Sequence, residues 1–97
     1  MVRQILRRVE ERYLRLFAEP GDAATFKHLI DQVDACMDVL EDPAIPGFIK
    51  AMDYYRTVGL IDLFCEHYAK HVDWRILLGL RRELVRLLKG SLRRWGA

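Results

Sequence analysis

Residues 26–40, FKHLIDQVDACMDVL, carry the most regular hydrophobic pattern in this 97-residue chain. Apolar side chains recur at spacings of three and four, which is the period of an α-helix with one buried face. The pattern predicts a helix over about 23–41. The apolar face of this helix is made of Phe26, Leu29, Ile30, Val33, Cys36, Met37 and Leu40.

Working outward from this segment, the same helical spacing recurs on both sides, and no stretch alternates with the period of a β-strand. A helix with one apolar face must pack against other elements, so a chain of such helices forms a bundle. The sequence predicts an all-α fold, a compact bundle of four to five helices in a single domain over 1–97. The expected helices are 2–18, 23–41, 46–57, 60–71 and 74–94.

Four short breaks separate these helices, and one of them is the segment 42–47, which contains Pro43 and Pro46. Pro20-Gly21-Asp22 is expected to end the first helix and cap the second, and Asp73 to cap the last. Gly59 suits a C-terminal cap, which would divide 46–57 from 60–71. In the first of those two helices we expect Phe48, Met52 and Tyr55 to face the core.

Composition limits the setting of the protein. The chain is 52% hydrophobic and 31% charged, which is typical of amphipathic helices and not of a disordered chain. Charges interrupt every turn near the N-terminus, and no segment approaches about 18 uncharged apolar residues. We therefore expect a cytoplasmic protein in which Cys36 and Cys65 are reduced and buried as small hydrophobic side chains.

The charge is unevenly distributed, although its sum is only +2. Residues 20–42 carry one basic and six acidic groups, and residues 74–97 carry seven basic groups and one acidic group. Helical geometry gathers the basic side chains within an arc of roughly 60°. This basic ridge is Arg75, Arg82, Arg86, Lys89 and Arg93.

A second set of like charges lies opposite the apolar stripe of the helix over 23–41. This acidic ridge is Asp31, Asp34, Asp38, Glu41 and Asp42. Like charges four residues apart repel by a few tenths of a kcal/mol, so each ridge destabilises its own helix slightly unless opposite charge meets it. The alternative interpretation is that both ridges are simply solvated helix faces.

The sequence holds only a weak candidate metal pair and no catalytic signature. His67 and His71 are four residues apart, a spacing that places two imidazoles on one helix face. A zinc site needs further ligands, and no second His/Cys pair accompanies them, so no metal or other cofactor is expected. Because no phosphate-binding loop or nucleophile with its base is present either, we expect no enzyme and no small-molecule substrate.

The distribution of charge therefore predicts a small non-enzymatic protein-interaction module, an adaptor, regulator or assembly subunit that acts through its basic C-terminal helix. Its partner would be another protein or a second copy, with the basic ridge of one copy meeting the acidic ridge of the next. The alternative is that the same ridge binds a polyanion, either nucleic acid or an anionic membrane surface. Against nucleic acid, the net charge is low and no known recognition motif occurs.

Overall fold

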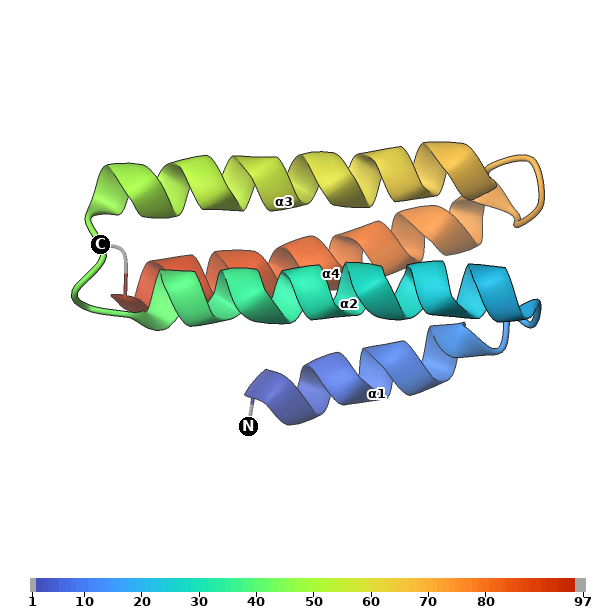
Figure 1. The fold of residues 1–97 in the computed structure, drawn as a ribbon, viewed down its shortest axis with the longest axis horizontal. Helices are drawn as coiled ribbons and strands as arrows, with labels where there is room; N and C mark the ends of the chain where they lie inside the picture. The colour runs from blue at the N-terminus through green and yellow to red at the C-terminus, as the bar shows by residue number, and fades with distance from the viewer. Residues whose placement is uncertain (1, 96–97) are drawn as a thin grey trace.

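Four α-helices make up most of residues 2–95, the part of the chain described by this computed structural model (Figure 1). They are α1 (Val2–Leu14), α2 (Pro20–Glu41), α3 (Gly47–Tyr68) and α4 (Trp74–Trp95). Consecutive helices run in opposite directions, and residues 2–95 contain no β-strand. The all-α prediction is confirmed, with four helices and not five. No helix in this range is both long and apolar enough to cross a membrane.

The helices α2 and α4 form the centre of the bundle. Each of them contacts the other three helices, whereas α1 and α3 lie on opposite sides of the pair and do not touch within the described range (Figure 1). A helix covered from three directions needs a wide apolar surface. In keeping with this central position, α4 buries Leu77, Leu80, Leu84, Val85, Leu87 and Leu88.

The core of α2 is the one that its sequence pattern predicts. All seven apolar residues of its stripe are buried, and none is more than 5% exposed. The helix nevertheless begins at Pro20, three residues before the predicted start. Proline suits the first helical position because its fixed φ is helical and its missing N–H would lack a partner there anyway.

The helix α3 is continuous, which contradicts the predicted break at Gly59. It runs from Gly47 to Tyr68, and no glycine among residues 2–95 has a positive φ, the conformation that a C-terminal glycine cap usually adopts. Glycine weakens a helix interior by about 1 kcal/mol relative to alanine, too little to break a helix held by packing on both sides. The expected helices 46–57 and 60–71 are therefore one element.

The predicted core face of the first half of α3 was also wrong. Phe48, Met52 and Tyr55 are 67–72% exposed. The opposite side of the helix packs against α2 and α4 and presents a more mixed set of side chains to the core. These buried residues are Lys50, Tyr54, Thr57, Ile61, Phe64 and Tyr68.

Four aromatic rings close the end of the bundle where the α1–α2 and α3–α4 loops meet. Phe17, from the first loop, stacks on Phe26 at 4.9 Å between ring centroids and meets Phe64 and Tyr68 edge-on. The hydroxyl of Tyr68 donates a 2.8 Å hydrogen bond to Asp22 Oδ1. These contacts fix the loop after α1, which ends at Leu14 and not at residue 18 as predicted.

The start of α4 agrees with its prediction. The Asp73 carboxylate accepts a 2.9 Å hydrogen bond from the backbone N–H of Arg75, so it satisfies one of the free donors of the first turn. The helix begins at Trp74, as expected.

Candidate interaction surfaces

Four cations of the basic ridge project from the outer side of α4. Arg82, Arg86, Lys89 and Arg93 are all exposed, and no acidic side chain of residues 2–95 pairs with them. Their spacing of three and four residues places them in one row. We call these four residues the basic face of α4.

A shallow depression of about 600 Å³ runs along the basic face. Its basic lining consists of the four residues of the face and Arg81. Its apolar lining is Leu78, which is 45% exposed, and Val85, which is 8% exposed. The surface therefore combines positive charge with a small apolar contact area.

Two further cations of α4 already have acidic partners. Arg75, the fifth member of the predicted ridge, lies 3.6 Å from the Asp73 carboxylate. Arg81 donates a 2.5 Å hydrogen bond to Asp62 on α3, and this contact raises the pKa of Arg81. Of the six cations of α4 whose side chains the structure describes, only these two are paired with an acidic group.

Glu83, the single acidic residue of α4, is used by α1. It accepts hydrogen bonds of 2.6 Å from Arg12 and 2.7 Å from the Tyr13 hydroxyl. Burial, together with the bond to Glu83, raises the pKa of Tyr13. Because Glu83 faces α1, it leaves the basic face uncompensated.

The acidic ridge of α2 is met by α1 in the same chain. Arg3 pairs with both Asp34 and Asp38, and it also donates a 3.0 Å hydrogen bond to the Asp34 carbonyl oxygen. Arg7 adds a second contact to Asp34, at 3.4 Å. The positive charge that meets Asp34 and Asp38 of α2 thus comes from α1.

The other members of the acidic ridge have separate surroundings. Glu41 accepts a 2.9 Å hydrogen bond from the hydroxyl of Ser91, which is fully buried. Asp42 follows the last turn of α2 and accepts a 2.9 Å bond from the N–H of Ala44. Asp31 is exposed and has no charged partner in residues 2–95. The structure therefore does not bring the acidic and basic ridges together within one chain.

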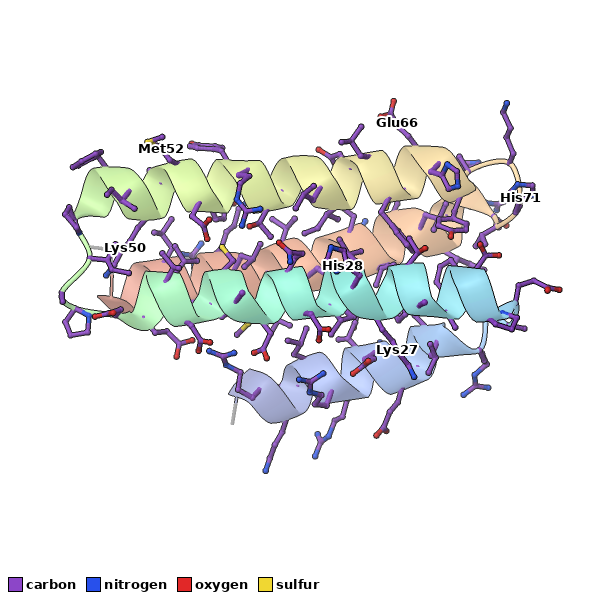
Figure 2. The ribbon with its side chains drawn as sticks, in the orientation of Figure 1. Lys27, His28, Lys50, Met52, Glu66 and His71 are labelled. Carbon is purple, nitrogen blue, oxygen red and sulfur yellow. The ribbon has the colours of Figure 1, made fainter. Side chains whose placement is uncertain are left out.

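The two histidines considered as a metal pair do not lie on one helix. His67 is in the last turn of α3, whereas His71 is in the loop beyond it (Figure 2). The His67 ring packs edge-on against Tyr68 at 4.8 Å. No group of three or more possible ligands occurs among the described residues.

Both cysteines are free thiols. Burial raises the pKa of Cys36 to about 12 and that of Cys65 to about 11. Neither side chain therefore holds the thiolate at neutral pH that nucleophilic catalysis requires.

A second surface, which sequence reasoning missed, covers the outer side of α3. Phe48, Met52, Tyr55 and Leu63 are 61–72% exposed and lie in one row with Gly59. We call these five residues the outer stripe of α3. Figure 2 shows Met52 projecting away from the other three helices.

No family model, curated protein or solved structure matches this chain. Its function is therefore inferred from the two surfaces described above.

One pattern in the sequence could have revealed the outer stripe. When 47–68 is read as a single helix, apolar side chains occupy two opposite sides of it, and only one side can face a core built from this chain. When the segment is divided at Gly59, the second apolar side is not apparent, because each half then has the pattern of an ordinary amphipathic helix.

Proposed function

We propose that this protein is a non-enzymatic interaction module that binds an acidic surface of a partner protein through the basic face of α4. The observation that carries this proposal is the uneven neutralisation of charge. Arg3 and Arg7 meet the acidic ridge within the chain, whereas no acidic group of residues 2–95 meets Arg82, Arg86 or Lys89.

Binding an acidic partner would relieve repulsion within α4. Arg82 and Arg86 are four residues apart, as are Lys89 and Arg93, and each such pair costs a few tenths of a kcal/mol. Leu78 and Val85 add an apolar contact beside the cations. This combination suits an amphipathic helix that carries leucine on one side and glutamate or aspartate beside it.

A partner different from this chain is favoured over a second copy at this face. For a second copy to present its acidic ridge, Asp34 and Asp38 would have to release Arg3 and Arg7. The exchange replaces existing ion pairs with new ones, so it gains little free energy.

The second candidate function is binding of a polyanion, nucleic acid or anionic lipid, by the same four cations. Their spacing along one exposed row would allow several phosphates to be neutralised, with a steep dependence on salt. The apolar lining of the depression favours the protein partner, since phosphate contacts do not need it.

The test compares three probes at low and high salt. They are a synthetic acidic amphipathic helix, a DNA duplex and vesicles with anionic lipid. We expect Arg82→Glu/Arg86→Glu to weaken peptide binding by at least about tenfold. The control is Arg8→Glu/Arg15→Glu, which changes the net charge equally at two exposed arginines outside α4.

Tighter binding of DNA or vesicles than of peptide, again lost with Arg82→Glu/Arg86→Glu, would favour the polyanion. Absence of binding to all three probes at low salt would contradict both candidate functions.

A further inference from the structure

We propose that the outer stripe of α3 is the contact surface between two copies of this chain, paired antiparallel about a two-fold axis. This inference does not depend on the proposed function of α4. It begins from the position of the stripe: its residues lie directly opposite the buried side of α3, on the side of the bundle farthest from α1 (Figure 2).

The stripe is long and uncharged. It extends over 16 residues, or about 22 Å between its ends. Single exposed apolar residues are ordinary, but a continuous row of them marks an interaction surface. With two aromatic rings and two aliphatic side chains each more than 60% exposed, two copies would together bury on the order of 1,000 Å², the lower bound for a specific interface.

The spacing of the stripe is self-complementary. Positions 48 and 63, and likewise 52 and 59, lie symmetrically about the midpoint between residues 55 and 56. In an antiparallel pair centred there, Phe48 meets the Leu63 of the second copy and Met52 meets its Gly59. Each contact occurs twice, as a two-fold interface requires.

Side-chain size favours the antiparallel arrangement over a parallel one. There is open space above Gly59, since nothing lies within 4 Å of the position that a Cβ atom would occupy. The antiparallel pair places the flexible Met52 side chain in that space. A parallel pair would instead set glycine against glycine and methionine against methionine, leaving a gap beside a crowded contact.

Two ion pairs flank the stripe, and Glu66, which forms no ion pair among residues 2–95, follows its C-terminal end on the same side of α3 (Figure 2). On the α2 side, Arg56 lies 3.0 Å from the Asp53 carboxylate, and on the α4 side Arg81 binds Asp62. A second copy approaching α3 therefore meets no unpaired cation there. The basic face of α4 would repel its own copy, so α3 is the surface on which two identical chains can meet.

The first test is the native mass by size exclusion with light scattering. We expect a dimer of twice 11.4 kDa that persists at high salt, because apolar contacts are not screened. Met52→Glu/Tyr55→Glu should raise its dissociation constant by at least about 100-fold. The control Ile5→Glu changes a side chain that is 48% exposed on α1, and it should leave the dimer intact.

Circular dichroism and thermal unfolding show whether each variant remains folded. The proposal is overturned by a monomer at high micromolar concentration in both salts, or by a folded Met52→Glu/Tyr55→Glu variant that still dimerises. A dimer that dissociates as the salt concentration rises would also overturn it, because salt weakens contacts between charged side chains and not contacts between apolar ones.

The second test fixes the orientation by mixing Met52→Cys protein with Gly59→Cys protein and oxidising at pH 8. The antiparallel pair predicts that crosslinks between the two variants form more readily than crosslinks within either one. The raised pKa values of Cys36 and Cys65 keep the native thiols largely unreactive at this pH. Preferential pairing of Met52→Cys chains with each other would overturn the antiparallel arrangement.

Different substitutions test the proposed dimer and the proposed interaction of α4, so that either proposal can be contradicted without the other. Arg82→Glu/Arg86→Glu should leave the dimer unchanged, and Met52→Glu/Tyr55→Glu should leave peptide binding by each monomer unchanged.

Discussion

At the scale of single residues, Cys36 shows how burial alone changes chemistry. Its side chain is fully buried between α2 and α3, with Sγ 3.7 Å from the carbonyl oxygen of Asp53. A thiolate there would lose its hydration, and this loss outweighs the opposing effects of Thr57 and Arg56, so burial raises the pKa of Cys36 from 9.0 to about 12. The folded protein therefore binds this proton more tightly than the unfolded chain does.

We predict that Cys36 makes the protein sensitive to alkali. Because the folded pKa is raised, the stabilisation from the neutral thiol is complete below pH 9 and is lost between about pH 9 and 12. By pH 10 the loss should be about 1 kcal/mol. Urea unfolding under reducing conditions at pH 8 and pH 10 measures it.

Cys36→Ala provides the comparison. Its own cavity lowers stability at both pH values, so the relevant quantity is the change between them, which should be smaller than in wild type by about 1 kcal/mol. Equal changes in the two proteins would contradict the prediction.

At the scale of elements, tertiary packing keeps α3 helical through Gly59, although glycine by itself favours the end of a helix. Gly59 is exposed and lies inside the helix, where glycine costs backbone entropy. Thr57 and Ile61, on either side of it, are fully buried, so both halves of α3 are anchored in the same core. Ending the helix at Gly59 would remove one half from that core.

Substitution of Gly59 by alanine tests this continuity. We expect Gly59→Ala to raise the free energy of unfolding by about 0.5–1 kcal/mol, because the helical φ suits alanine and the space around it is open. A glycine that capped the helix with positive φ would instead lose stability on this change. Both chains are compared by urea unfolding in the Met52→Glu/Tyr55→Glu background, so that association does not contribute.

Gly79→Ala is the matched control within α4. A Cβ atom there would lie 3.3 Å from the Tyr13 hydroxyl oxygen, so that Tyr13 must shift and the gain should be smaller. Destabilisation by Gly59→Ala would contradict a continuous α3.

At the scale of the whole molecule, the net charge of +2 is the sum of helices whose charges have different surroundings. The arginines of α1 neutralise part of α2 and hold α1 against the bundle, whereas the basic face of α4 remains available. The acidic ridge is therefore not uniform. Asp34 is part of an internal contact and Asp31 is not.

Charge reversal at Asp34 and at Asp31 should have different effects on stability. Asp34→Lys removes the contacts with Arg3 and Arg7 and adds repulsion, so we expect it to cost about 1 kcal/mol at low salt and less at high salt. Asp31→Lys, with the same change in charge, should stay within about 0.5 kcal/mol of wild type. Urea unfolding in both salts provides the measurement, and equal effects would show that Asp34 does not hold α1.

The sequence by itself determined the helical class, the core stripe of α2 and the start of α4. These depend on local physics, namely the period of apolar residues and the hydrogen bond of Asp73 to the first turn. It also placed Arg82, Arg86 and Lys89 in one row, because helical geometry fixes relative directions within an element.

Only the tertiary structure decided which side of α3 is buried and which charges meet. The sequence of α3 is apolar on two sides, so its pattern does not determine which side is buried. The shape of the α2–α4 surface against which α3 packs determines it. Likewise, Arg3 and Asp34 are 31 residues apart, and no local rule brings them together. The outer stripe of α3 and the uncompensated basic face of α4 both follow from those long-range choices.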